Sequence, residues 1–348
     1  MNESESRQKN TKTRAKTIAT VAGMIALTLF IFLTVNLLFM PKYIEENLDG
    51  RITSEFYREK TNPDVLFVGS STVFAGINPI VLWEEYGITS FDRSNSSQTS
   101  WISYYMIKDA IEVSDPKLVV LDISFFRYED DYTDEAGNRK ALDGMRVSKT
   151  KYKCIQAAKS PDETYKDYIF PIGRFHSRWQ YLTADYWKYL YVKPAVSYNG
   201  YLPVYTVEPA KGEREVQAAD DSFMTDRNAL FLDNIITICR DNGIRLMLIK
   251  VPSYQPKWGE IFEEDVRMIA DSNGVEYVDF DKHEAQIGLD YSVDTADGGG
   301  HMNDAGANKF TKYLGEYLTK HYEVSDHRDD PAYSKIWDQK CERYHNGQ

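Results

Sequence analysis

Two short segments, far apart in the chain, carry the side chains that could perform nucleophilic chemistry. The first, Gly69-Ser70-Ser71-Thr72, directly follows the apolar run 64–68. A serine placed where a buried strand gives way to a turn and a helix projects its hydroxyl from the carboxyl edge of the sheet, and nearby backbone N–H groups can stabilise an oxyanion. Because position 73 is valine, the segment is not a Gly-x-Ser-x-Gly elbow. The Gly-Ser-Ser tripeptide by itself is weak evidence for catalysis, because most such tripeptides are ordinary turns.

The second segment places a histidine in a glycine-rich loop before an expected helix. It reads Asp294-Thr-Ala-Asp297-Gly-Gly-Gly-His301-Met-Asn303-Asp-Ala-Gly306. A serine nucleophile needs an imidazole as its base, and the imidazole needs an acid that fixes its tautomer. Glycines let such a loop fold back, so that an acid can reach its neighbouring histidine. The alternative is a solvated loop in which Asn303 or Asp304 only caps the helix and His301 has no function.

A metal site is a third interpretation, and the residue spacing does not favour it. Asp279-x-Asp281-x-His283 lacks the ligand spacing and the glycine of a calcium loop. No run has a recognised zinc spacing, and no two of the three cysteines form a CxxC pair; they are Cys154, Cys239 and Cys341. The sequence therefore predicts no metal, no cofactor and no disulfide framework.

Short apolar runs alternate with helical patterns on both sides of a long insertion. Strands are expected at 64–68, 89–91, 117–123, 245–251 and 275–280, and helices at 78–86, 97–113, 224–242, 261–272 and 304–319. This alternation predicts an α/β fold with a parallel sheet and helices on both faces. The ligand site of such a sheet lies beyond the carboxyl ends of its strands.

The expected domain is 63–322, with an insertion at 124–223 and a polar tail at 323–348, in which a short helix could dock. The insertion holds 12 of the 25 tyrosines, with Trp179 and Trp187. These side chains could stack on sugars, lie at a membrane interface, cover a partner protein, or simply pack the core of a cap.

Residues 17–40 form a run of 24 residues without a charge, and about 20 suffice to cross a bilayer. Residues 1–16 hold five basic and two acidic side chains, which favours a cytoplasmic N-terminus. The run is longer than the apolar region of a signal peptide, about 7–15 residues, and no Ala-x-Ala pattern follows it. We therefore expect an uncleaved single-pass anchor in the cell membrane, a linker at 41–62 and an extracellular domain. A cleaved signal peptide and a buried soluble helix are the alternatives.

Composition excludes several classes of protein. The chain has 348 residues, is 42% hydrophobic and carries a net charge of −12. It is therefore neither disordered as a whole nor multispanning, since only one run is long and apolar enough to cross a bilayer. The acidic balance argues against nucleic acid as the main partner, because phosphate binding needs a basic face.

Together these segments resemble the SGNH (GDSL-like) hydrolase superfamily. Gly69-Ser70-Ser71 is similar to its Gly-Asp-Ser-like block, which makes Ser71 the nucleophile, and Met302-Asn303-x-x-Gly306 is similar to its His-Leu-Asn-x-x-Gly run. Asp297-x-x-x-His301 resembles its Asp-x-x-His block with one extra residue, so Asp297 is the first choice of acid and Asp294 the reserve. The resemblance covers residues 60–125 and 225–320 and implies a flavodoxin-like three-layer α/β/α sandwich.

The resemblance also implies where an oxyanion hole would form. Ser94 stands where the family often has a glycine, and Leu121-Asp-Ile-Ser-Phe has no Gly-x-Asn-Asp. The donors would therefore be the backbone N–H of Ser71 and groups around Ser94, Asn95 or Gln98.

The stretches 76–87 and 96–105 are similar to membrane-anchored members that act beside a membrane-bound O-acyltransferase in cell-envelope polymer acylation. This implies an extracytoplasmic acyltransferase, for acetyl groups above all, or an esterase. It would act on a cell-envelope polysaccharide through a Ser-His-Asp acyl-enzyme mechanism. The alternative is a non-catalytic envelope-assembly factor that binds polysaccharide or the membrane-bound O-acyltransferase.

Overall fold

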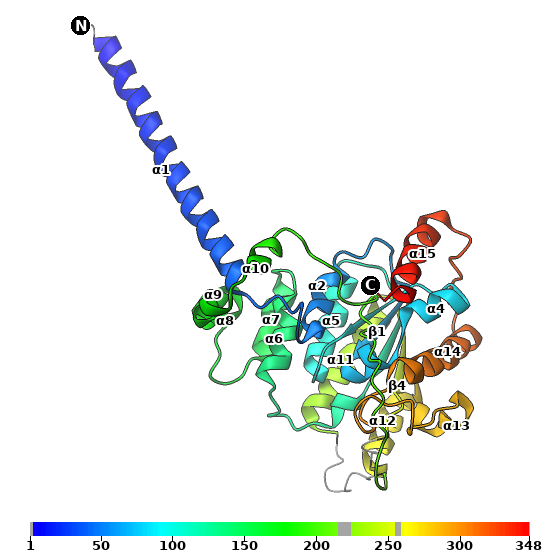
Figure 1. Cartoon of the computed structure of the whole chain (residues 1–348). Helices are drawn as coiled ribbons and strands as arrows, with labels where there is room; N and C mark the ends of the chain where they lie inside the picture. Colours follow the sequence, from blue (N-terminus) through cyan, green and yellow to red (C-terminus); the bar gives the residue numbers. More distant parts are fainter. Residues whose placement is uncertain (1–2, 215–223, 255–258, 348) are drawn as a thin grey trace. The chain divides into compact units, whose positions relative to one another are not determined.

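A five-stranded parallel sheet organises the larger part of the chain (Figure 1). The computed structural model describes residues 3–214, 224–254 and 259–347. The strand order is β2-β1-β3-β4-β5, the order of flavodoxin-like sheets. The predicted α/β fold with a parallel sheet is therefore confirmed. The strands are β1 (Val65–Gly69), β2 (Ser90–Ser94), β3 (Leu118–Asp122), β4 (Arg245–Lys250) and β5 (Glu276–Asp279).

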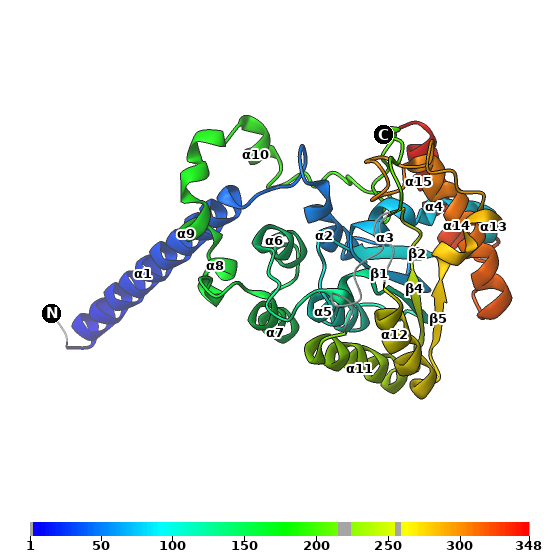
Figure 2. The same ribbon diagram turned by 90° about the horizontal axis from the view of Figure 1, so that it is seen from below.

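The continuous apolar runs of β1 and β3 suit these strands because both of their faces are covered. One face, which presents Phe67, Val120 and Ile249, packs mainly against a group of four helices. Figure 2 shows this group of helices on the opposite side of the sheet from α5 and α11. The helices are α3 (Ser71–Gly76), α4 (Pro79–Tyr86), α14 (Asp304–His321) and α15 (Pro331–His345).

The other face presents Leu66, Leu121 and Leu248 to a second apolar core. The helices of this core are α2 (Ile52–Phe56), α5 (Ser100–Ile111), α11 (Asp226–Asp241) and α12 (Glu260–Asn273). Helix α7 (Lys149–Ala158) lies against α5, and α6 (Glu135–Asp143) contacts α7. The short α13 (Glu284–Ile287) follows β5. The two cores and the sheet between them are the three layers of the sandwich.

Local sequence sets the bounds of α4. The Asn78 side chain accepts a hydrogen bond from the Ile80 N–H at 3.0 Å, and Pro79 occupies the first turn, where its missing N–H costs nothing. Gly87 ends the helix at a φ of 68°, a conformation that glycine adopts without strain. The predicted start and end of this helix are confirmed.

The polar tail contains a full helix, α15, rather than only a short docked segment. Its Trp337 is completely buried and stacks on Trp83 of α4 with the ring centroids 5.2 Å apart. The Trp337 indole N–H donates to the Thr61 hydroxyl at 3.1 Å. Residues 331–345 therefore belong to the core that covers the first face of the sheet.

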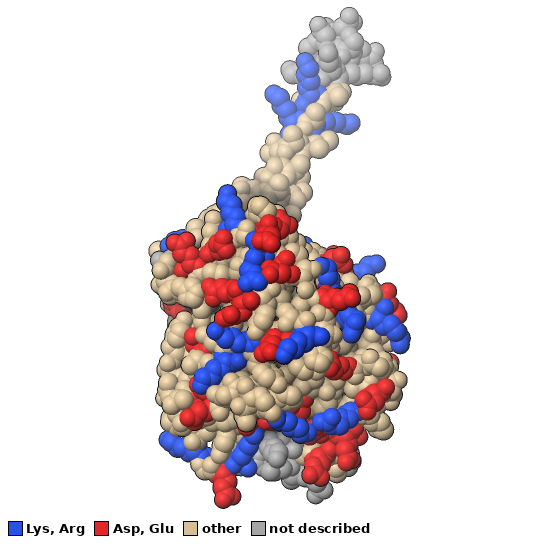
Figure 3. Space-filling model, turned by 90° about the vertical axis from the view of Figure 1, so that its right-hand side faces the viewer, with Lys and Arg blue, Asp and Glu red and all other residues tan. Residues whose placement is uncertain are grey.

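A second compact unit consists of residues 1–42 and 164–194. It contains α1 (Glu3–Phe39), α8 (Tyr165–Ile169), α9 (Pro171–Phe175) and α10 (Ala184–Lys188). By length and composition, α1 could cross a membrane over Asn10–Phe39. Figure 3 shows Lys and Arg side chains near the start of this helix, followed by an uncharged stretch.

The predicted insertion 124–223 is thus shared between the two units. Residues 124–163 and 195–214 pack with the larger unit, and residues 164–194 pack with α1. Residues 215–223 of the insertion, and residues 1–2 and 348 of the two tails, lie outside the described residues.

Candidate functional site

Ser71 is the first residue of α3 and lies two residues after the end of β1. Ser70 precedes it in an extended conformation, with φ −102° and ψ −154°, which turns the chain from strand to helix. The half-buried Ser71 side chain contacts a residue 230 positions away: its Oγ lies 2.7 Å from His301 Nε2. The parallel sheet makes this contact possible because it gathers the carboxyl ends of its strands along one edge.

His301 lies in a tight loop that also holds the acid. The His301 backbone N–H donates to Asp297 Oδ1 at 2.8 Å, and the ring Nδ1 lies 2.5 Å from Asp297 Oδ2. The base of the loop is closed by a bridge between Thr295 and Met302. The one-residue-longer spacing of this Asp-x-x-x-His segment is therefore accommodated inside the loop, and the acid reaches its own histidine.

Glycine is required at position 299 of this loop. Gly299 has a φ of +120°, which side-chain-bearing residues rarely adopt. A Cβ there would lie 2.8 Å from the Tyr254 Cβ, closer than such atoms approach. The Gly299 carbonyl accepts a hydrogen bond from the Tyr254 N–H at 2.9 Å, so the close approach also fixes the loop.

The electrostatics of the loop favour an ionised Asp297. Partial burial alone would raise its pKa, but the hydrogen bonds from the His301 ring and backbone, with the positive charge that the imidazole can carry, hold the pKa below its ordinary value. A carboxylate at Nδ1 favours the tautomer with its proton on Nδ1. Nε2 is then free to accept the proton of Ser71.

Asp294, the reserve acid, has other partners. Its side chain is buried, and Oδ2 accepts hydrogen bonds from Lys309 Nζ at 2.7 Å and from the Asp290 N–H at 2.8 Å. The Asp294 carbonyl accepts from the Asn303 N–H, and Asn303 caps α14. Asp294 therefore braces the start of α14, while Asp297 contacts His301.

The side chains predicted as oxyanion donors, those of Ser94, Asn95 and Gln98, have partners or positions away from Ser71 in the structure. Asn95 Nδ2 donates to Gln98 Oε1 at 3.0 Å and to the Thr53 hydroxyl at 3.5 Å. Gln98 Nε2 donates to the carbonyl of residue 93 and to the hydroxyl of residue 103, both at 3.2 Å. Both hydrogens of each amide are thus engaged in a buried cluster. Ser94 is buried beside the strand partner Gly69.

Asp122, at the end of β3, is a residue of this edge that sequence reasoning did not single out. Its Oδ2 accepts from the Thr72 hydroxyl at 2.6 Å, and its Oδ1 accepts from the Ser124 hydroxyl at 2.8 Å. Burial raises the pKa of Asp122, and these hydrogen bonds oppose the rise. The contact ties the residue after Ser71 to the neighbouring strand. An acid that ends an apolar strand at the ligand edge was the available signal.

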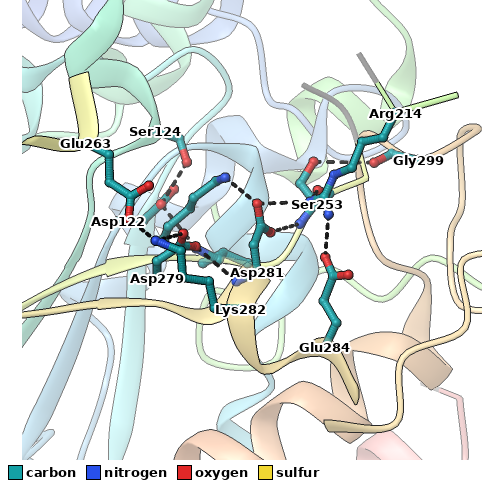
Figure 4. Close-up of polar contacts among 12 residues, drawn as sticks. Asp122, Ser124, Arg214, Ser253, Glu263, Asp279, Asp281, Lys282, Glu284 and Gly299 are labelled. Atoms are coloured by element: carbon teal, nitrogen blue, oxygen red, sulfur yellow. Dashed lines mark hydrogen bonds and ion pairs between the residues drawn. The ribbon is translucent and has the colours of Figure 1, made fainter. Parts of the chain in front are cut away.

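An ion-pair network braces the His301 loop from the side of β4 and β5 (Figure 4). Asp281 pairs with Lys250 at the end of β4 and with Arg214 at 2.9 Å. Asp281 Oδ1 also accepts from the Ser253 N–H at 3.0 Å. The Ser253 hydroxyl lies 3.3 Å from the Gly299 carbonyl oxygen, to which it donates. The network therefore reaches the loop that carries Asp297 and His301.

The acids and the histidine of the 279–283 segment have separate partners. Asp281 belongs to the network described above, and Asp279 caps the turn after β5 by accepting from the Asp281 N–H. His283 Nδ1 lies 2.8 Å from the Tyr313 hydroxyl. The three side chains therefore serve the packing around β5 and α14.

The part of the insertion around residue 208 runs along the His301 loop. The Glu208 N–H donates to the Thr295 carbonyl at 3.0 Å, and the Gly298 N–H donates to the Glu208 carbonyl at 3.1 Å. Tyr205, close to this contact in the sequence, leaves 65% of its surface exposed. An aromatic face is thus available on the strip of chain that flanks the loop.

Comparison with known proteins gives distant likenesses to solved structures. The sequence matches no family model, and no curated protein matches it. Among solved structures, the fold is similar to that of a protein from Bacteroides fragilis described as a "putative acylhydrolase". The sequence identity is 12% and the TM-score 0.36, over 77% of this chain and 94% of the other.

Proposed function

We propose that the protein is a serine-dependent acyl-transfer enzyme of the SGNH type, an acyltransferase or esterase. One observation carries the proposal: the hydrogen-bonded series from Ser71 Oγ to His301 Nε2 and from His301 Nδ1 to Asp297, at 2.7 Å and 2.5 Å. Nucleophile, base and orienting acid within hydrogen-bond reach are the arrangement that nucleophilic acyl transfer needs.

The chemistry follows from these contacts. Ser71 Oγ attacks the carbonyl carbon of an ester or thioester while His301 Nε2 takes the hydroxyl proton. Collapse of the tetrahedral intermediate breaks the bond to the leaving group, which receives that proton from His301, and leaves an acyl-Ser71. An acceptor hydroxyl then gives its proton to His301 and attacks the acyl carbon. Collapse of this second tetrahedral intermediate breaks the bond to Ser71 Oγ, which receives the proton from His301, and releases the new ester. Asp297 keeps the imidazole oriented throughout.

For the oxyanion we propose the backbone N–H of Ser71, because it opens α3 at the reacting atom. The Asn95 and Gln98 amides would have to leave their present partners to contribute. Each donor of this kind is worth about 10²–10³ in kcat. Because the Asn95 and Gln98 amides are engaged elsewhere, we expect a low kcat.

We propose that α1 is an uncleaved anchor with its N-terminus in the cytoplasm. The support is that the end of α1 belongs to a folded unit of the chain. Asn36 is 6% exposed; its Nδ2 donates to the Ile169 carbonyl at 3.2 Å, and its Oδ1 accepts from the Ile172 N–H at 3.0 Å. Removing α1 as a signal peptide would leave these two backbone groups without the partner they have here.

The proposed acceptor is a cell-envelope polysaccharide, and the proposed acyl donor system is a membrane-bound O-acyltransferase. Support for a sugar acceptor is the exposed Tyr205 beside the His301 loop, since flat aromatic faces can stack on sugar rings. With water as acceptor, the same acyl-Ser71 gives an esterase. Comparing transfer of a labelled acetyl group from a chromogenic ester to envelope polysaccharide with its release into water tells the two apart.

The experiment that tests the enzyme is the variant Ser71→Ala. Loss of both transfer and hydrolysis, with unchanged folding, is expected. The non-catalytic alternative, an envelope-assembly factor, predicts the opposite: polymer acetylation in cells is lost when the gene is deleted and retained with Ser71→Ala.

A further inference from the structure

The segment 164–194 differs in composition from the rest of this acidic protein. Its residues include ten Tyr, Trp or Phe, with five basic side chains against two acidic ones, whereas the whole chain has a net charge of −12. Four of its large aromatics are more than half exposed: Trp179 at 67%, Tyr181 at 65%, Trp187 at 52% and Tyr191 at 81%. A soluble surface rarely exposes so many large aromatic side chains within so short a segment.

Contacts within the same unit place this segment beside the end of α1. Phe170 packs on Phe32 with ring centroids 5.7 Å apart, and Asn36 holds the backbone between α8 and α9. From residue 17, where the uncharged run begins, about 20 helical residues at about 1.5 Å each cover the hydrocarbon thickness of a bilayer. Asn36 then lies at the edge of the hydrocarbon, and so does the segment it holds.

We propose that residues 164–194 form a collar in the interface of an anionic phospholipid bilayer, on the side where α1 ends. The collar's Trp and Tyr rings lie at the headgroup level, where their apolar bodies and polar tips are both satisfied. Its basic side chains, among them the exposed Lys166 and Lys188, contact lipid phosphates. The proposal rests on the anchor proposed above and is independent of the reaction at Ser71.

The charge of the collar favours lipid over a partner protein. Interfaces between proteins are depleted in lysine, whereas basic side chains next to exposed aromatics beside a membrane span are typical of a segment that binds anionic lipid. The rings of Trp179, Tyr181, Trp187 and Tyr191 are each more than half exposed, so their faces remain available to lipid.

Tryptophan quenching by brominated lipid tests the collar on the full chain. The protein is reconstituted, without any other protein, in vesicles of phosphatidylglycerol and phosphatidylcholine brominated near the top of the acyl chains. We expect marked quenching of the wild-type emission and loss of most of it in Trp179→Tyr/Trp187→Tyr. The other four of the six tryptophans are common to both proteins, so the difference reports these two positions.

The charge is tested with Lys166→Gln/Lys188→Gln. Each lysine near an anionic surface raises the ratio of lipid-bound collar to collar released into water about fivefold. We therefore expect less quenching than in the wild type in phosphatidylglycerol vesicles and equal quenching in pure phosphatidylcholine.

Equal quenching in the wild type and Trp179→Tyr/Trp187→Tyr would overturn the proposal, as would a collar that becomes shielded only when a second membrane protein is added. Vesicle flotation after a carbonate wash distinguishes a collar that does not bind lipid from an α1 that does not anchor the chain. A chain without an anchor leaves the vesicles, whereas an anchored chain without a collar floats with them.

Discussion

Replacing Asp297 by asparagine perturbs the site at one atom. Asp297 Oδ1 accepts from the His301 backbone N–H, and Oδ2 lies 2.5 Å from the ring Nδ1. Asparagine has the same shape, and its Oδ1 can keep the backbone hydrogen bond. Its amide hydrogens would then point at Nδ1, which must become an acceptor. The ring responds by carrying its proton on Nε2, which faces Ser71.

The magnitude follows from this change of tautomer. With its proton on Nε2, the imidazole cannot take the proton of Ser71 Oγ. In serine proteases that use a Ser-His-Asp triad, the corresponding Asp-to-Asn change lowers kcat by about 10⁴, which is about 5 kcal/mol in the barrier. We expect a loss of the same order here, about 10³–10⁴. The free energy of unfolding should change by less than about 1 kcal/mol, because the Asp297 side chain is 45% exposed.

Asp294→Asn is the matched control, because both acids lie in the same segment and only Asp297 contacts His301. The Asp294 carboxylate pairs with Lys309 and is buried, so asparagine there should cost about 1–3 kcal/mol of stability. Its effect on kcat should be small. The assay is acyl release from a chromogenic acetyl ester, with urea unfolding on the same samples.

The reasoning is refuted if the two variants exchange their effects. Activity in Asp297→Asn that stays close to that of the wild type would mean that another group orients His301. A large loss of kcat in Asp294→Asn, with unchanged stability, would identify the reserve acid as the functional one.

Three further variants test the residues around the site. Ser253→Ala removes the hydroxyl that donates to Gly299, and we expect kcat to fall about tenfold with KM unchanged, at a cost of about 1 kcal/mol in urea unfolding; a change in KM alone would speak against a positioning role. Thr72→Val leaves Asp122 without its 2.6 Å donor, and should cost about 1–3 kcal/mol of stability and lower kcat. Asp92 is wholly buried, and its carboxylate oxygens have no hydrogen-bond partner among the described residues, so burial raises its pKa well above the ordinary value. The native carboxyl is then protonated where the unfolded one is ionised, and the wild type should lose about 1.4 kcal/mol per pH unit from about pH 4 up to the raised pKa. Asp92→Asn should abolish this slope; identical pH profiles of urea unfolding would contradict it.

The elements of the sheet could be predicted from the sequence because their determinants are local. The apolar runs before Gly69 and after residue 117 are strands, and the pair Asn78-Pro79 starts a helix. The approach of Ser71 to His301 was an inference from topology, because parallel strands end at one edge. The contact at 2.7 Å agrees with that inference in geometry, while the catalytic roles remain predictions.

The remaining features depend on contacts that no local pattern records. Trp337 is buried by stacking on Trp83, which lies far earlier in the chain, so the sequence predicts only that a short helix of the polar tail could dock. Residues 164–194 divide from the rest of the insertion because Asn36 and Phe32 pack against them. The hydrogen bonds of Gln98 join residues within five positions of it, but they depend on how the chain turns between β2 and α5, which no pattern in the sequence records.

The central claim is that Ser71 forms a covalent acyl-enzyme with His301 as base. Intact-protein mass spectrometry on the full chain, quenched in acid soon after mixing with an activated acetyl ester, tests it most directly. We expect one added acetyl group, located by peptide mapping on Ser71, faint in His301→Ala and absent in Ser71→Ala. An acetyl group at another residue, or turnover without any adduct in the wild type while Ser71→Ala stays active, would contradict the claim.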